Sequence, residues 1–138
     1  MERWKENDQI AMKKTTLILL IFAAGLAACA SQPSGPALTE SQQIGQRLFT
    51  QDCSACHAIK GTTVIVGPPL TGIAITGGQR VEGQDAATYI ERSITAPSEY
   101  IVEGYQDLMV KNFADQLTDA ELQGLVDYLM TFDQLPSE

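Results

Sequence analysis

The chain has 138 residues, which is enough for one domain of ordinary size. Its formal net charge of −8 argues against nucleic acid as a partner, and its hydrophobic content of 44% argues against a wholly disordered chain. Three cysteines and a single histidine are too few for the paired ligand sets typical of structural zinc sites.

Residues 1–28 have the pattern of a leader. Two lysines precede an apolar run at residues 15–28, which is shorter than the roughly twenty residues of a membrane span. The run ends in a Leu-Ala-Ala-Cys sequence at Cys29, which is similar to a bacterial lipobox, in which the cysteine receives lipid. An ordinary secretion signal and an uncleaved anchor are the alternatives, and all three place the rest of the chain outside the cytoplasm. Residues 1–11 are polar, and we expect translation to start at Met12.

Residues 29–38 are predicted to form a lipidated cysteine and a flexible tether, because they are rich in Ser, Pro and Gly and show no periodicity. From Cys29 onward the chain has five basic and fourteen acidic side chains, a balance of −9. Such a surface suits a partner with a basic docking face. We therefore expect a domain at residues 39–135 that is held to a bilayer through acylated Cys29.

Two capping boxes, at residues 39–42 and 118–121, predict the starts of two helices. The first helix is expected to run to about residue 52 and the second to about residue 132. Gly45 inside the first helix indicates the close approach of another helix, and we expect the last helix to pack there. The expected apolar face of the last helix consists of Leu122, Leu125, Val126, Leu129 and Met130.

The first helix leads directly into Cys53-Ser54-Ala55-Cys56-His57, and a Cys-x-x-Cys-His run is the attachment site of a c-type haem. Each thiol adds across one vinyl group of the porphyrin, and the following histidine can bind the iron. The alternatives are a structural disulfide and a thioredoxin-like redox pair. The redox pair requires a βαβ pattern around it, which the sequence lacks.

Residues 64–66 (Val-Ile-Val) are expected to form either a short strand or apolar cover for the haem edge. Gly67-Pro68-Pro69-Leu70 then forms a rigid turn, because two prolines exclude both helix and sheet interior. A backbone carbonyl in this region could accept from His57 Nδ1 and leave Nε2 free for iron. Residues 70–83 are predicted to be mostly loop. A helix is predicted at residues 85–96, with Ala86, Tyr89, Ile90 and Ile94 facing inward.

His57 is the only histidine, so the second iron ligand must be of another kind. A methionine thioether is the usual alternative. Two of the four methionines fall in the leader, and Met130 is expected to face the core, which leaves Met109 in an irregular segment. Water, Lys60 or Lys111 could bind the iron instead. If both axial positions are filled, electron transfer is favoured over chemistry on a bound substrate.

Together these motifs resemble the class I c-type cytochromes. The motifs, in family order, are Gly45 and Phe49, Cys53-x-x-Cys56-His57, Gly67-Pro68-x-Leu70, Gly104-Tyr105…Met109-x-x-Asn112-Phe113, and Leu117-Thr118-Asp119…Leu125-Val126-x-Tyr128-Leu129. The resemblance implies an all-α fold in which the first and last helices cross around one covalent haem c. It also implies that Cys53 and Cys56 hold the haem, that His57 and Met109 bind its iron, and that the Pro68 carbonyl orients His57.

The chain departs from that family at two places. Family members commonly have proline after the axial methionine, whereas this chain has Val110. Many also place a tryptophan near a haem propionate, but the only tryptophan here lies in the leader. Arg80, Tyr100 and Tyr105 are the candidates to replace it.

A small lipoprotein of this type also resembles the monohaem subunits of respiratory or photosynthetic membrane complexes, such as alternative complex III, and the haem domains of oxidase subunit II. We therefore expect a one-electron carrier on the periplasmic, extracytoplasmic face of a bacterial membrane. Its expected partners are redox proteins and other subunits of such a complex. The alternatives are a peroxidase-like or ligand-binding enzyme, if Met109 leaves the iron, and an accessory domain whose haem lies off the electron path.

Overall fold

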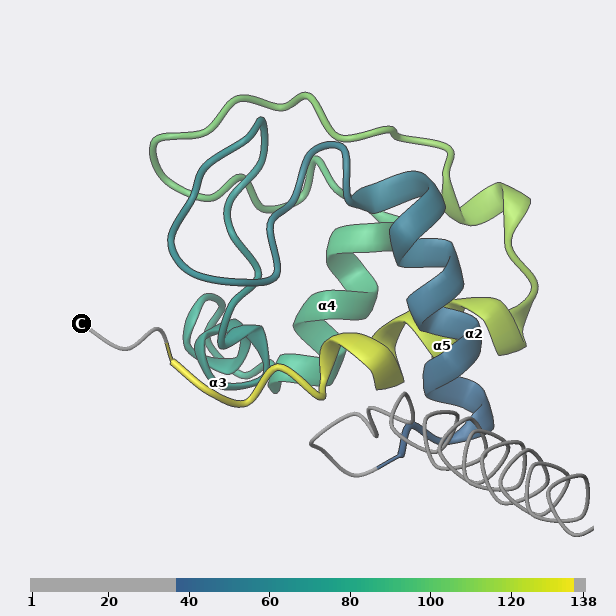
Figure 1. Ribbon diagram of the computed structural model, residues 1–138. Helices are drawn as coiled ribbons and strands as arrows, with labels where there is room; N and C mark the ends of the chain where they lie inside the picture. The colour runs from purple at the N-terminus through teal and green to yellow at the C-terminus, as the bar shows by residue number, and fades with distance from the viewer. Residues whose placement is uncertain (1–36, 136–138) are drawn as a thin grey trace, which may run out of the picture. The chain divides into compact units, whose positions relative to one another are not determined.

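The computed structural model describes residues 37–135, and these contain helices and no strand. The predicted leader, lipidated Cys29 and the tether up to residue 36 lie outside the described residues. Within residues 37–135 no helix is long and apolar enough to cross a membrane. The helices are α2 (Glu40–Leu48), η2 (Phe49–Cys53), α3 (Ile73–Thr76), η3 (Gly77–Gln79), α4 (Ala86–Thr95), η4 (Ala114–Gln116) and α5 (Asp119–Leu129) (Figure 1). The predicted all-α fold class is confirmed.

Helix α2 begins at the predicted capping box. Thr39 Oγ1 accepts from the backbone N–H of Gln42 at 3.2 Å, and Gln42 Oε1 accepts from the N–H of Thr39 at 3.0 Å. These bonds satisfy two of the N–H groups that a helix start leaves without partners. Helix α2 continues without a break into η2, a π-helical turn that ends at Cys53. The helical run therefore delivers the chain directly to the first cysteine.

Helices α2 and α5 cross each other, as Figure 1 shows. The crossing point is a pair of glycines, since a β-carbon on Gly45 would lie only 1.9 Å from Gly124 O. Ser41 Oγ donates to Asp127 Oδ2 at 2.5 Å across the crossing. The packing of the first helix against the last, predicted from Gly45, is confirmed.

Helix α5 starts at the second predicted capping box but ends at Leu129, three residues before the predicted end. Met130 is 36% exposed, so its predicted place on the core-facing side is wrong. The reason is that the helix gives way to tighter turns there, with Thr131 N donating to Tyr128 O and Phe132 N to Leu129 O. Of the other predicted face residues, Leu125, Val126 and Leu129 are buried, with Leu125 fully enclosed, and Leu122 is partly buried.

Helix α4 buries the predicted residues Ala86, Tyr89, Ile90 and Ile94, and Asp85 caps its N-terminus by accepting from Thr88 N at 2.7 Å. The segment between residues 70 and 83 is not mostly loop, because it contains α3 and η3. These single turns have no periodic signal of their own. They are held by tertiary contacts, such as the bond from Ala74 N to Phe132 O at 3.2 Å.

Candidate functional site

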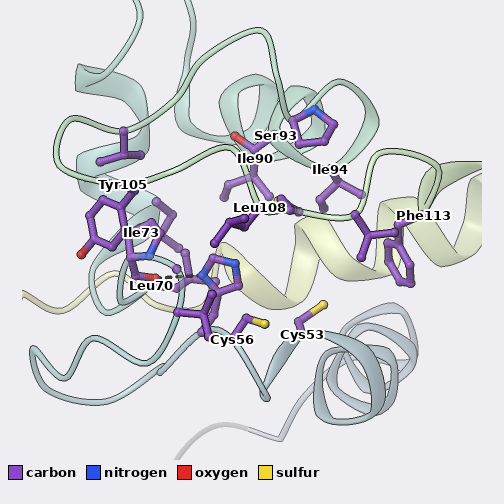
Figure 2. Close-up of a pocket in the computed structure, with 18 of the residues that line it drawn as sticks. Cys53, Cys56, Leu70, Ile73, Ile90, Ser93, Ile94, Tyr105, Leu108 and Phe113 are labelled. Carbon is purple, nitrogen blue, oxygen red and sulfur yellow. Dashed lines mark hydrogen bonds between the residues drawn. The ribbon is translucent and has the colours of Figure 1, made fainter.

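A large apolar cavity lies between η2, α3, α4, α5 and the irregular segment from Tyr100 to Phe113 (Figure 2). Its volume is about 200 Å³. A single water molecule needs roughly 10–15 Å³ of such space. A space of this size is not a packing defect. Side chains such as Leu70, Ile73, Ile90 and Ile94 line it, which suits a flat apolar ligand.

The end of the α2–η2 run places two thiols on the wall of this cavity. Cys53 is the last residue of η2, and a turn follows in which Cys56 N donates to Cys53 O at 3.0 Å. Both cysteines are free and half-buried, and Figure 2 shows their sulfur atoms on the same side of the pocket. Burial raises the pKa of Cys53 to about 11, with smaller contributions from Asp52 and Cys56, so this group is a neutral thiol near pH 7.

His57 lines the same cavity and has a fixed orientation. Its Nδ1 lies 2.8 Å from Pro68 O, the bond drawn as a dashed line in Figure 2. Because a carbonyl oxygen only accepts, Nδ1 is the donor in this bond, and in the neutral ring the lone pair is then on Nε2. The contact between Pro68 and His57 that the family resemblance implied is therefore present in the structure.

The backbone of Gly67 lies close against the His57 ring. A β-carbon on Gly67 would lie 2.3 Å from His57 Cε1 and 2.8 Å from Nδ1. The backbone of Gly67 is itself tied down, because its N–H donates to Cys56 O at 3.0 Å. Only glycine lets the backbone approach the imidazole this closely. Sequence reasoning noted Gly67 within the Gly-Pro motif but gave no sign of this contact.

Met109 also lines the cavity and packs against the core cluster, although it belongs to an irregular segment. Its neighbours Leu108 and Val110 are 64% and 57% exposed. Among residues 37–135, neither Lys60 nor Lys111 contributes to the cavity lining. The structure thus brings one imidazole and one thioether to the same cavity.

Residues 64–66 were predicted to form either a short strand or apolar cover for the haem edge, and the structure matches the second prediction only in part. They make no strand, and Val64 and Ile65 are 56% and 49% exposed without lining the cavity. Val66 does line it, and its N–H donates to Cys56 O at 3.2 Å. Only one of the three therefore reaches the cavity wall.

A haem carries two anionic propionate groups, so a cavity that holds one is expected to offer a cation, and Arg80 provides it. It is the only arginine or lysine in the described residues that lines the cavity. Its Nε is buried without a hydrogen-bond partner, and its guanidinium lies 5.7 Å from the centre of the Tyr89 ring. A buried guanidinium nitrogen with no acceptor is costly unless an anion joins it. Tyr100 and Tyr105 also line the cavity, so all three predicted candidates belong to its wall.

An all-α domain with a thiol pair, an imidazole, a thioether and an arginine with a buried Nε around one apolar cavity has the features of a c-type haem protein. The family model of cytochrome c matches residues 42–133, so the chain belongs to the cytochrome c family. It is an electron-transfer protein with one covalent haem c. No curated protein matches the chain.

Proposed function

We propose that this member of the cytochrome c family is a lipid-anchored carrier of single electrons. Cys53 and Cys56 would each add their S–H bond across one haem vinyl group, so that sulfur bonds to one carbon and hydrogen to the other. His57 Nε2 and Met109 Sδ would bind the iron. The observation that carries these roles is that all four side chains line one cavity. When bound, the haem supplies a site that accepts one electron from a reduced donor protein and gives it to an oxidised acceptor.

The pair of iron ligands favours a carrier over an enzyme. The bond between His57 Nδ1 and Pro68 O would keep Nε2 directed at the iron, because a metal-bound histidine is oriented through its second nitrogen. If Met109 also bound the iron, it would occupy the position that a substrate would otherwise need. If Met109 did not bind, a peroxidase-like or ligand-binding activity would be the alternative.

The Cys53 thiol is expected to need activation before it can react with a vinyl group. A thiolate is the more nucleophilic form, and burial keeps Cys53 protonated near neutral pH. The same environment disfavours premature disulfide formation with Cys56. Both thiols would therefore stay available for the haem.

The proposed anchor rests on the sequence. Acylation of Cys29 would supply two or more lipid chains, which is enough for stable membrane attachment. Residues 30–37, fully extended, would reach roughly 25–30 Å from the lipid. The domain would work on the periplasmic side of a bacterial membrane. Its acidic surface would select redox proteins with basic docking faces, as a subunit or neighbour of a respiratory or photosynthetic complex.

The first test is purification from native membranes in mild detergent, followed by haem staining of the denatured chain and an optical spectrum. We expect a stained band of this chain and the weak near-infrared absorption of methionine-ligated ferric haem. Cys29→Ser is the matched control and should release the holoprotein from the membrane with an unchanged spectrum. A chain without covalent haem would refute the proposed cysteine roles, and a mature chain whose Cys29 carries no acyl group by mass spectrometry would refute the lipid anchor.

The same preparation separates a fixed subunit from a free carrier. Co-migration with a large quinol-oxidising assembly would support a subunit, whereas a band that runs alone would support a tethered carrier. Rapid reduction of the haem by the natural donor would exclude the accessory role. A haem that stays oxidised while the complex turns over would support it.

A further inference from the structure

The segment that carries Met109 is held by side chains rather than by its backbone. Between Ile101 and Phe113, the described backbone hydrogen bonds are Tyr105 N to Val102 O at 3.0 Å and Leu108 N to Gln106 O at 2.9 Å. Neither bond involves Met109 or the residue after it. Apolar packing holds Met109 itself against the core cluster, whereas Leu108 and Val110 on either side of it line the cavity.

One carboxylate, that of Asp107, links both arms of this segment. Asp107 lies two residues before Met109 and forms an ion pair with Lys111, two residues after it. The same oxygen of Asp107 accepts from Ser98 Oγ at 3.3 Å. Ser98 lies just beyond the C-terminal end of α4, which itself forms part of the cavity wall. The carboxylate therefore joins the two arms to each other and to the end of a core helix.

We propose that Asp107 is a positioning residue that holds Met109 in the cavity, and this inference rests on the proposed role of Met109 as an iron ligand. The family commonly has proline after this methionine, which restricts the backbone at that point. Here Val110 leaves the backbone free to rotate, and the links from Asp107 to Lys111 and Ser98 restrict it instead.

The expected effect is small and sensitive to salt. The side chains of Lys111 and Asp107 are 49% and 43% exposed, so this is a surface pair. Exposed pairs of this kind change an equilibrium by roughly twofold to fivefold at 25 °C. A foreign ligand binds only when Met109 has left the iron. Its apparent affinity therefore rises by the same factor as the fraction of open protein.

The test uses the full-length ferric holoprotein and imidazole as the foreign ligand, with loss of the near-infrared methionine band as the readout. Asp107→Asn keeps the size of the side chain but loses its charge, and we expect imidazole to bind about twofold to fivefold more tightly. Lys111→Gln should give the same change, which also excludes Lys111 acting as a replacement ligand in the Asp107 variant. High salt should move the wild type toward both variants and leave the variants unchanged.

Glu99→Gln is the matched control, since it removes the exposed Arg92–Glu99 pair at the end of α4 and should leave imidazole affinity unchanged. A wild-type protein with covalent haem but no methionine band would refute the role of Met109 itself. A wild type with the band, but with Asp107→Asn binding imidazole as the wild type does, would overturn only the positioning role. Equal shifts in Glu99→Gln and Asp107→Asn would also overturn it, because a general charge effect would then suffice.

Discussion

Gly45→Ala is expected to destabilise the fold through the crossing of α2 and α5. The added β-carbon would lie 1.9 Å from Gly124 O, 2.4 Å from Gly124 C and 2.7 Å from Tyr128 Cβ. Ordinary contacts begin at 3.4 Å, so α2 would have to move about 1.5 Å away from α5. Two of the three obstructing atoms belong to backbone, which cannot turn aside as a side chain can.

The loss of unfolding free energy in Gly45→Ala is the sum of a steric cost, a gain in helix propensity and the weakening of nearby contacts. Overpacking of a core contact costs about 1–3 kcal/mol, and alanine gains about 1 kcal/mol over glycine inside a helix. Separation of the helices would also weaken the bond from Ser41 to Asp127, and hydrogen bonds to charged groups contribute about 1.5–3 kcal/mol. The ring contact between Phe49 and Tyr128, 5.9 Å between centroids, would loosen as well. We expect the free energy of unfolding to fall by about 2–3 kcal/mol.

Urea unfolding of the holoprotein, followed by far-ultraviolet circular dichroism, measures this change. Gly124→Ala is the matched control, because it has the same gain in helix propensity on the partner helix. Its β-carbon would lie 2.9 Å from Ser41 O, so a shift of about 0.5 Å relieves it. Its loss should therefore be smaller, below about 1 kcal/mol. Equal stability of Gly45→Ala and wild type, or a larger loss in Gly124→Ala, would refute the reasoning.

Three further predictions concern the site and the helix caps. Gly67→Ala should push the His57 imidazole aside, since its β-carbon would lie 2.3 Å from Cε1. We therefore expect a larger high-spin fraction of the ferric haem by electron paramagnetic resonance, and an unchanged signal would contradict this. Bonds from Thr118 hold the pKa of Glu121 below its ordinary value, so this carboxylate stabilises the fold above its unfolded-state pKa, and that contribution is lost as pH falls through the lower folded-state pKa. Glu121→Gln keeps the capping box without a titrating group, and acid unfolding curves should therefore show a shallower loss of stability; identical curves would count against the cap. Arg80→Met removes a cation beside the haem and should lower its reduction potential, as measured by redox titration; an unchanged potential would show that Arg80 does not act on the cofactor.

The parts of the fold that the sequence predicted correctly depend on short-range chemistry. The capping boxes that begin at Thr39 and Thr118 span only four residues each, and both are present. The buried face of α4 follows from helical spacing over one element. The Cys53–His57 run likewise carries its meaning within five residues. The partner of Gly45 could be inferred because a glycine inside a helix has few other uses.

The remaining features depend on contacts between distant segments. Helices α3 and η3 are too short for a periodic pattern, and they form because neighbouring elements hold them. Met130 lies at a core spacing, but the helix ends before it and the side chain turns outward. The buried, unpartnered Nε that favours Arg80 over Tyr100 and Tyr105 as the partner of a propionate is revealed by no sequence pattern. The link of Asp107 to Ser98 is also invisible without the fold.

The hydrogen bonds from Val66 N and Gly67 N to Cys56 O close a loop whose residues 60–66 are all exposed. A third bond, from Leu70 N to Ala58 O at 2.7 Å, closes the same loop further along. The stem is therefore fixed independently of the loop tip, where a β-carbon on Gly61 would meet nothing within 4 Å. The tip is therefore a suitable site for inserting a peptide, such as an electrode-binding tag. An insertion there would lie beside the redox centre and would leave the support of His57 unaltered.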